Sequence, residues 1–412
     1  MSVELVCTVC KTPYHSSQDR FICSNCGASI EPILDLEKRR NTMIQVIKKG
    51  SSRSEGIWGY RPMFPGFTNV MPVSMGEGNT PLCHAGTLGK VYGIKTLLLK
   101  NETVNPTGTY KDRFASLALS LFCSEGAKSV ALGSAGNAGS SVAAYAAKAG
   151  IPCYVILPDG GVFARAQQAM SYGAHFIRCK GEVNDCIDLV EQGVSRYHWR
   201  NASTTMLHNP LASEGYKSIV YELFEQMSQT VPDVILCPIG GGILISKIFR
   251  ALRELISLGL TQRMPRLVGV QAAGCAPVVR AFEQGSKVTS VWENPKTIAG
   301  SINDPVTFEG ITALHVIRES AGTAVAVNDE EILAAMRLCA SKEAILAEPA
   351  SAVTLAAAAN LRKSGWIRPM DSVVCVITGS ALRDLPLLSG GTQEAPSVHP
   401  GNLEELDLTM RR

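Results

Sequence analysis

Short apolar runs alternate with longer amphipathic stretches along most of the chain beyond residue 90. The apolar runs have the length of single strands, whereas the stretches between them space their apolar residues as a helix does. The strand-like runs are 95–100, 129–133, 153–158, 175–179, 233–238, 267–272 and 372–378, and the helix-like segments include 140–150, 214–227 and 330–344. Strands that alternate with helices predict an α/β fold with a largely parallel sheet.

The composition supports a large folded protein and narrows the classes of partner. Of 412 residues, 46% are hydrophobic and 18% are charged, which suits about two to three domains. Basic and acidic side chains number 39 and 36, so the net charge of +3 indicates no basic surface for nucleic acid. No apolar run reaches the roughly 18 residues that cross a bilayer, and the first residues lack the pattern of a secretory signal. We therefore expect a soluble, cytoplasmic protein without nucleic-acid or membrane partners.

Four of the thirteen cysteines form two Cys-x-x-Cys pairs near the N-terminus. Cys7 and Cys10 make the first pair, and Cys23 and Cys26 make the second. Four thiolates complete a closed tetrahedral zinc site, which predicts a structural zinc ribbon. A reduced cluster that has lost its metal and an iron ligand set are the alternatives. The other nine cysteines are scattered, several in apolar runs, as small buried residues are in a reducing compartment.

Two glycine-bearing loops follow predicted strands and lead into predicted helices. The first covers 134–139 and reads Ser-Ala-Gly-Asn-Ala-Gly, and the second covers 239–243 and reads Ile-Gly-Gly-Gly-Ile. The backbone N–H groups at such helix starts suit an anion, a carboxylate in the first loop and a phosphate in the second. Neither loop matches the patterns that bind nucleoside triphosphates or dinucleotides.

One lysine and two hydroxyl side chains are further candidate site residues. Lys111 lies in the segment NPTGTYKDRF at a predicted helix start, behind a turn. Thr378 and Ser380 follow the last strand, where the ligands of open α/β sheets bind. Lysine is the side chain that forms a Schiff base with an aldehyde, so the set suits a phosphorylated aldehyde.

Several longer motifs extend over nearly the whole chain. Beside the cysteine pairs they are GEGNTPL (76–82), NPTGTYKDR (105–113), NPLASEGYKS (209–218), GVQAAGCAPVVRAF (269–282), EPASA (348–352) and TGSALRD (378–384). With these motifs the chain resembles the fold-type II pyridoxal-phosphate enzymes, and among them the threonine synthase family. The resemblance implies two α/β domains with parallel or mixed sheets, preceded by the zinc ribbon. It also implies pyridoxal 5'-phosphate and a structural Zn²⁺ ion, a small amino acid substrate and a homodimer.

The resemblance assigns a role to each candidate residue. Lys111 would hold the cofactor as a Schiff base and shuttle protons, and Asn137 would bond the ring hydroxyl of the cofactor. Thr378 would face the pyridine nitrogen, with Ser380 as the second choice. The substrate carboxylate would lie on Ser134, Ala135, Gly136, Asn137 and Ala138, and the cofactor phosphate on Gly240, Gly241, Gly242 and Ile243. Asp112 and Arg113 are interpreted as structural residues of the helix start.

The expected domain boundaries follow the same resemblance. A zinc ribbon is expected at 1–40, and a small α/β domain at 112–204. The large cofactor-binding domain would combine 41–111 with 205–389, and a polar C-terminal tail would cover 390–412.

One departure from the family leaves the substrate open. Ala212 stands where the family places an arginine, which removes a charge-assisted contact worth about 1.5–3 kcal/mol from a phosphate-bearing substrate. Lys217, His208 or Arg165 could replace it. The leading hypothesis is a threonine synthase-type enzyme, with O-phosphohomoserine as the substrate of a true threonine synthase. The alternatives are β-replacement on O-phosphoserine or serine, as in cysteate and cysteine synthases, a threonine or serine dehydratase, and a non-catalytic zinc-ribbon binding protein.

Overall fold

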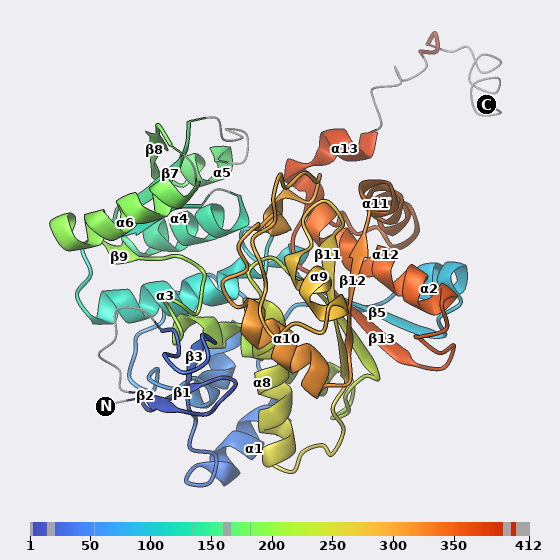
Figure 1. The fold of residues 1–412 in the computed structure, drawn as a ribbon, viewed down its shortest axis with the longest axis horizontal. Helices are drawn as coiled ribbons and strands as arrows, with labels where there is room; N and C mark the ends of the chain where they lie inside the picture. The colour runs from blue at the N-terminus through green and yellow to red at the C-terminus, as the bar shows by residue number, and fades with distance from the viewer. Residues whose placement is uncertain are drawn as a thin grey trace.

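The protein has the mixed α/β architecture that the sequence predicts. The structure, a computed structural model, describes residues 3–14, 21–52, 54–134, 136–159, 166–181, 183–389 and 397–400 (Figure 1). Most of the predicted tail at 390–412 therefore lies outside the described residues. Among the described residues, no helix combines the length and the apolar character that crossing a membrane requires.

The larger of two α/β sheets has six strands in the order β12-β11-β10-β13-β5-β4. All neighbours are parallel except β4, which runs antiparallel to β5. Side chains alternate along each strand, so Val234 and Ile235 belong to separate hydrophobic clusters on opposite faces. The strands are β4 (Leu82–His84), β5 (Thr96–Asn101), β10 (Val234–Pro238), β11 (Arg266–Ala272), β12 (Thr323–Val327) and β13 (Ser372–Ile377).

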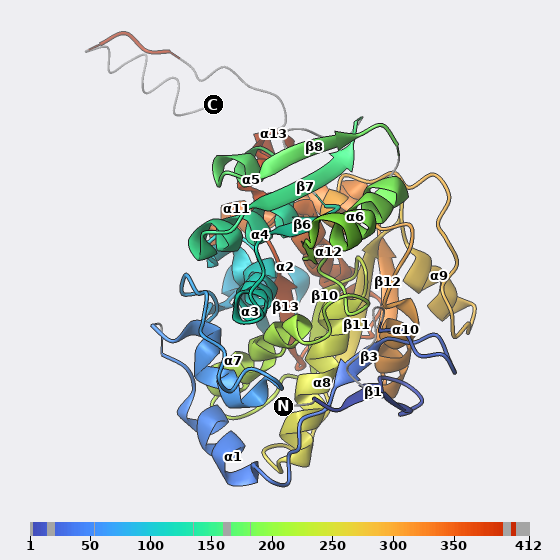
Figure 2. The ribbon, with the colours of Figure 1, turned by 90° about the vertical axis from the view of Figure 1, so that its left-hand side faces the viewer.

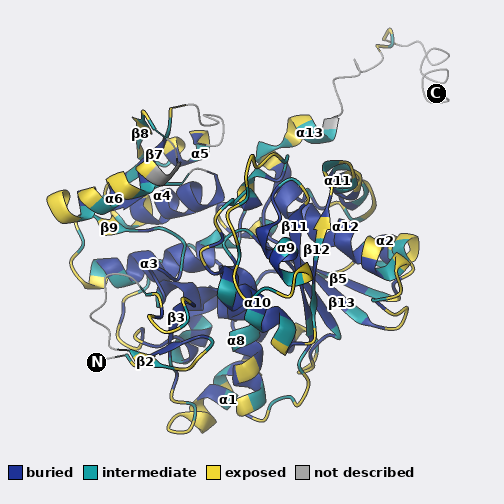
Figure 3. Ribbon diagram, viewed as in Figure 1, coloured by how far each residue is buried: buried dark blue, intermediate teal, exposed yellow. Residues whose placement is uncertain are grey.

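Helices cover both faces of this sheet. On one face pack α2 (Gly86–Tyr92), α11 (Asp329–Glu343) and α12 (Pro349–Lys363). On the other face pack α8 (Ile243–Ser257) and α10 (Gly310–Glu319). Figure 3 shows α8 and α12 as largely buried, as expected for helices in the middle layers of the molecule.

The smaller sheet has four parallel strands in the order β8-β7-β6-β9. It lies between α4 (Asn137–Ala149) and α6 (Val183–Tyr197), which contact it through two different clusters. Helix α3 (Lys111–Ser124) packs against α4 and against the 3₁₀ helix η4 (Ala212–Lys217), so it lies between this sheet and the rest of the chain (Figures 1 and 2). The strands are β6 (Val130–Leu132), β7 (Cys153–Pro158), β8 (His175–Cys179) and β9 (Arg200–Asn201).

The two α/β sheets draw their strands from different parts of the chain, and these parts agree with the expected domain ranges. All four strands of the small sheet fall within 112–204, and all six of the large sheet fall outside that range. The boundaries themselves remain a proposal. The remaining helices are α1 (Arg40–Lys49), α5 (Gln167–Ser171), α7 (Ser218–Gln226), α9 (Pro277–Glu283) and α13 (Leu385–Ser389).

The N-terminal segment forms a separate three-stranded antiparallel sheet in the order β2-β1-β3. Its strands are β1 (Leu5–Cys7), β2 (Pro13–Tyr14) and β3 (Ile30–Pro32). Both ribbon views place it beside α8 and α10. The Thr8 hydroxyl lies 2.8 Å from that of Thr312 on α10, and Lys247 on α8 bonds Glu31 on β3 at 3.3 Å. This small unit is therefore anchored to the large sheet by polar contacts.

Candidate active site

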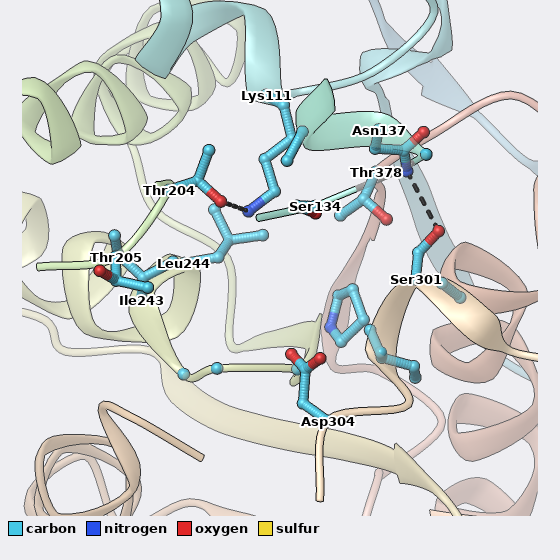
Figure 4. A pocket seen from close by; sticks show the side chains of 18 of the residues that line it. Lys111, Ser134, Asn137, Thr204, Thr205, Ile243, Leu244, Ser301, Asp304 and Thr378 are labelled. Carbon is cyan, nitrogen blue, oxygen red and sulfur yellow. Dashed lines mark hydrogen bonds between the residues drawn. The ribbon is translucent and has the colours of Figure 1, made fainter. Parts of the chain in front are cut away.

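A cavity of about 250 Å³ lies where both α/β parts contribute residues. It is lined from the starts of α3, α4 and α8, from the end of β13, and from the segment 300–309 (Figure 4). Parallel strands bring their carboxyl ends to one edge of a sheet, which is where such folds bind ligands.

Lys111 projects into this cavity from the first turn of α3. The turn before it is held against the end of β13, because the Tyr110 N–H donates to the Thr378 carbonyl at 2.9 Å. The Lys111 amine donates to the Thr204 hydroxyl at 3.0 Å and lies 5.0 Å from the centre of the Tyr110 ring (Figure 4). Burial lowers the pKa of Lys111 to about 8, although nearby carboxylates act in the opposite direction. A substantial fraction of the amine is therefore neutral near physiological pH and able to act as a nucleophile or base.

The triple-glycine loop forms a close turn at the start of α8. Gly242 has a φ of +99°, which strongly favours glycine. A Cβ atom on Gly240 would lie 2.5 Å from Asp304 Oδ2, and one on Gly241 would lie 3.1 Å from Glu309 Oε2. Side chains therefore do not fit here, and the N–H groups of the first turn of α8 have no partner within the helix. Such a cradle suits a phosphate.

The second loop leads into α4 in a similar way. Gly136 has a φ of +71°, and Ser134, Gly136, Asn137 and Ala138 all line the cavity. The Asn137 amide donates to the two Glu348 carboxylate oxygens at 2.8 and 3.0 Å, and Figure 4 shows its contact with Ser301. Ala135 lies outside the described residues. The helix start and its lining residues suit a carboxylate.

The two candidate hydroxyls occupy different positions. Thr378 lines the cavity, and its hydroxyl lies 3.0 Å from that of Ser351 on α12. Ser380 is not among the lining residues, since its hydroxyl accepts the Leu382 N–H at 3.3 Å and caps the 3₁₀ helix η6 (Ala381–Arg383). The structure therefore brings Thr378, and not Ser380, to the cavity.

The neighbours of Lys111 on α3 lie in a buried polar network. Arg113 donates to Glu102 at 2.7 Å and also pairs with Glu222, and none of these side chains is more than 2% exposed. Burial alone would lower the pKa of Arg113, but the two carboxylates outweigh it and raise the pKa well above its ordinary value. Asp112 accepts the Thr107 N–H at 2.7 Å. Both side chains therefore have structural partners, as the sequence analysis expects.

Three carboxylates line the cavity, and none was among the predicted site residues: Glu348 belongs to the motif 348–352, whereas Asp304 and Glu309 belong to no motif. Asp304 and Glu309 lie on the segment between the 3₁₀ helix η5 (Gly300–Ile302) and α10, and Figure 4 shows Asp304 directed into the cavity. Burial raises the pKa of Asp304 to about 6 and that of Glu309 to about 7. The segment carries no recognisable motif and reaches the cavity only through the tertiary fold. Lone acidic residues in a loop give no signal in the sequence.

The groups proposed to replace the missing arginine lie elsewhere. The buried Lys217 amine donates to the Met63 carbonyl and to Glu254, both at 2.9 Å, and His208 is held between Thr205 and Glu191. Neither side chain lines the cavity, and Arg165 lies outside the described residues. Of these three candidates, the structure therefore places Lys217 and His208 away from the cavity, where both are engaged in other contacts.

The four N-terminal cysteines converge as predicted. Their sulfur atoms all lie within 4.8 Å of one another, and three of the separations are 3.4, 3.5 and 3.6 Å. A tetrahedron of thiolates around Zn²⁺, with Zn–S bonds of about 2.3 Å, has sulfurs roughly 3.8 Å apart. The cluster has nearly that size.

Comparison with known proteins decides the family. The family described as "Pyridoxal-phosphate dependent enzyme" matches residues 73–379. The chain belongs to the pyridoxal-phosphate-dependent enzymes. The threonine synthase of Methanocaldococcus jannaschii is 36% identical over 381 residues, 92% of each chain. That of Methanosarcina acetivorans is 35% identical over 403 residues, 98% of this chain and 97% of the relative. The prediction of a threonine synthase-like enzyme of this family is thereby confirmed.

Solved structures support the same fold. Threonine deaminase isoform 2 from Solanum lycopersicum aligns with a TM-score of 0.65 at 17% identity, covering 86% of this chain and 94% of its own. Serine racemase from Dictyostelium discoideum aligns with a TM-score of 0.60 at 24% identity. The alignment covers 74% of this chain and 92% of the racemase chain. At these identities the likeness concerns the fold alone.

The residues present fit pyridoxal phosphate. Lys111 supplies the amine for the aldehyde, and the glycine loop with the start of α8 supplies N–H groups without side chains for the phosphate. Asn137 and Thr378 line the same cavity and supply further polar groups. When bound there, the cofactor would supply an electron-withdrawing ring that stabilises negative charge at the carbon atoms of an amino acid.

Proposed function

We propose that the protein eliminates or replaces the side-chain substituent of a hydroxy amino acid or its ester, as a threonine synthase-type lyase. The observation that carries this proposal is the position of Lys111, whose amine enters the cavity between two helix starts. One helix start suits a phosphate and the other suits a carboxylate, which are the two anionic ends of a cofactor and an amino acid.

Each residue has a role in this reaction. The first turn of α4 would bind the substrate carboxylate, and the first turn of α8 would bind the cofactor phosphate, so the substrate and the cofactor would each be held at one anionic end. Lys111 Nζ takes the proton from the α-carbon of the substrate, and its lowered pKa leaves the amine available as a base. Thr378, whose hydroxyl lies 3.0 Å from that of Ser351, would offer a neutral hydroxyl to the ring nitrogen of the cofactor. A neutral partner there favours elimination and replacement.

O-phospho-L-homoserine is the first substrate to test, because the curated relatives over nearly the whole chain are threonine synthases. The dehydratase and β-replacement alternatives remain, since Ala212 is buried and no arginine is among the described residues that line the cavity. The non-catalytic alternative has little support, because the cavity keeps its lysine and both loops.

The test is a product assay on the cofactor-loaded protein. Threonine and phosphate from O-phosphohomoserine, 2-oxo acid and ammonia from serine or threonine, and a substituted amino acid in the presence of a nucleophile would be separated by mass spectrometry. Turnover in any of these assays that is lost in Lys111→Ala supports the proposal. No turnover of any amino acid, from protein that binds the cofactor, would overturn it.

We also propose that the cysteine cluster binds one structural Zn²⁺ ion. The size of the cluster and the closed set of four thiolates support this, because no position stays open for a substrate. Metal analysis should give about one zinc per chain for the protein and much less for Cys23→Ser, whereas Cys83→Ser outside the cluster should keep it. Equal metal contents in both variants would contradict the assignment. The cytoplasmic location and the homodimer also remain proposals.

A further inference from the structure

Glu309 packs against the triple-glycine loop at the start of α8. Its backbone N–H donates to the Gly241 carbonyl at 2.8 Å. Its carbonyl oxygen would lie 3.1 Å from a Cβ atom added to Gly242, and its side-chain Oε2 would lie 3.1 Å from one added to Gly241. The backbone and the side chain of Glu309 therefore both contact the loop that suits the cofactor phosphate.

The two carboxyl oxygens of Glu309 differ in their partners. The residue is 1% exposed, and its Oε1 accepts the Met206 N–H at 2.8 Å. Its Oε2 is buried and has no hydrogen-bond partner among the described residues. The N–H groups of Gly240, Gly241 and Gly242 also donate to no atom of the described part of the chain. Buried polar atoms without partners are costly, so this oxygen and these N–H groups point to one ligand group that contacts both.

A phosphate can lie beside Glu309 only if the carboxyl group is neutral. A carboxylate repels a phosphate, whereas a carboxylic acid donates one hydrogen bond to it. Because Oε1 already accepts the Met206 N–H, Oε2 is the oxygen that would carry the proton. We propose that Glu309 binds the cofactor phosphate in its protonated form, with Oε2 donating to a phosphate oxygen beside the N–H groups of the glycine loop. The inference rests on the proposed function and adds a titratable residue to cofactor binding.

The surroundings of Glu309 favour its neutral form. Burial has the largest effect and raises the pKa of Glu309 to about 7, and Asp304 on the same segment acts in the same direction. The N–H groups of Met206 and Leu207 and the Lys111 amine act against it. The outcome is an acid that is largely neutral at and below pH 7, which is the form that a phosphate requires.

Two further titratable groups, the hydroxyls of Tyr110 and Tyr216, interact with Glu309. Burial raises the pKa of both hydroxyls well above the ordinary value, so neither changes its charge near neutral pH. A phosphate bound beside Glu309 adds negative charge and raises the pKa of the acid further. The affinity for the phosphate is therefore fully present below about pH 7 and falls as the pH rises above it.

The first experiment separates the phosphate contact from the Schiff base. Pyridoxine 5'-phosphate has a hydroxymethyl group in place of the aldehyde and so does not react with Lys111, and pyridoxine shares its ring but has no phosphate. Calorimetry on the apoprotein, with tetramethylammonium as the buffer cation, would give the ratio of their two dissociation constants. This ratio measures the contribution of the phosphate.

We expect the ratio to fall at least about threefold between pH 7 and pH 8.5, within the limit of about tenfold per pH unit for one proton. Buffers of different ionisation enthalpy should also show that the phosphate ligand takes up a proton on binding at pH 8. A constant ratio without proton uptake, or binding that requires an added metal cation, would overturn the inference. The proposed function would then stand, whereas a protein that binds no pyridoxine 5'-phosphate at any pH would contradict the proposed function itself.

The second experiment changes the acid while keeping its size. Glu309→Gln still accepts the Met206 N–H through Oε1 and still has a donor, but it does not ionise. Its ratio should stay within about twofold from pH 7 to pH 8.5, because the titrating group is gone. Glu309→Met has no donor, and at pH 6.5 its ratio should be at least about tenfold below that of Glu309→Gln, the loss of one hydrogen bond to a charged group.

Two control variants make the second experiment specific. Glu319→Gln changes an exposed acid on α10 and should behave as the unmodified protein does. Asp304→Asn should keep the fall of the ratio with pH, although the fall begins at a lower pH because Asp304 raises the pKa of Glu309. The same pH dependence in Glu309→Gln as in the unmodified protein would overturn the inference. If neither variant of Glu309 folds, the ratio in the unmodified protein still decides.

Discussion

Lys111 and Arg113 lie two residues apart on the first turn of α3, yet their surroundings differ completely. Arg113 is fully buried and paired with Glu102 and Glu222, and its pKa is raised. Lys111 faces a cavity, its amine donates to the Thr204 hydroxyl, and burial lowers its pKa to about 8. Burial disfavours the charged form of both side chains, but the carboxylates of Glu102 and Glu222 outweigh this effect for Arg113 and not for Lys111. Paired charges hold α3 in place, and the amine without a paired carboxylate is left available for chemistry.

Removing Lys111 should have the largest effect on function. Lys111→Ala removes both the amine that binds the cofactor and the base, so turnover should fall at least about a thousandfold. The free energy of unfolding should change little, because the amine has no buried ion pair. Product assays, cofactor absorption and denaturant unfolding measure this, with Lys148→Ala on the exposed face of α4 as control. Retained turnover in Lys111→Ala would show that Lys111, like Arg113, has no direct part in the chemistry.

Removing Arg113 should act mainly on stability. Arg113→Met would leave Glu102 and Glu222 buried without their partner, which costs about 3–5 kcal/mol of the free energy of unfolding. Denaturant unfolding of the variant, beside Arg337→Met on the exposed side of α11, would measure the loss. The protein that remains folded should still bind the cofactor. A stability equal to that of the unmodified protein would show that the network contributes little.

The glycine loop should respond more moderately. Gly242→Ala places a Cβ 3.1 Å from the Glu309 carbonyl at a φ of +99°, so the loop must shift and the affinity for the cofactor should fall about tenfold. Gly285→Ala is the matched control, since its φ is +68° but nothing lies within 4 Å of the added atom. It should lose stability through backbone strain and keep its affinity. Equal cofactor affinities in the two variants would show that the glycine loop does not bind the cofactor phosphate.

The pH dependence of cofactor loading should give the smallest but most specific effect. The Lys111 amine attacks an aldehyde only when it is neutral, so loading of the apoprotein should accelerate with rising pH and level off above about pH 8. An ordinary lysine would level off near pH 10.4. Stopped-flow absorption between pH 6 and pH 10, in steps of about half a unit, would locate the inflection. An inflection near 10 would show that burial does not perturb the amine.

The parallel strands and the cavity loops were predictable for a physical reason. Strands buried on both faces must be continuous apolar runs, so 153–158 coincides with β7, most of whose residues are buried. The run 175–179 coincides with β8, although this edge strand is exposed or partly buried. The strand β12 was not predicted, although its TAVAV run is as long as that of β8. The segment 214–227 was predicted as one helix, but it divides into the end of η4 and the helix α7.

The site was predictable only where chemistry requires a local pattern. Lys111, the two glycine loops and Thr378 each follow an element end and were found from sequence. Asp304, Glu309 and Thr204 come from connecting segments, and only the tertiary fold brings them to the cavity. The position of Ser380 could not be known either, since a shift of two residues along the loop turns its hydroxyl to cap η6.

The central claim is that Lys111 is the residue that binds the cofactor. Borohydride reduction of the loaded protein, followed by digestion and peptide mass spectrometry, would attach the cofactor permanently to the lysine that holds it. The added mass should lie on the peptide containing Lys111 and should be absent from Lys111→Ala treated in the same way. Modification of a different lysine, with Lys111 unmodified, would show that Lys111 does not hold the cofactor.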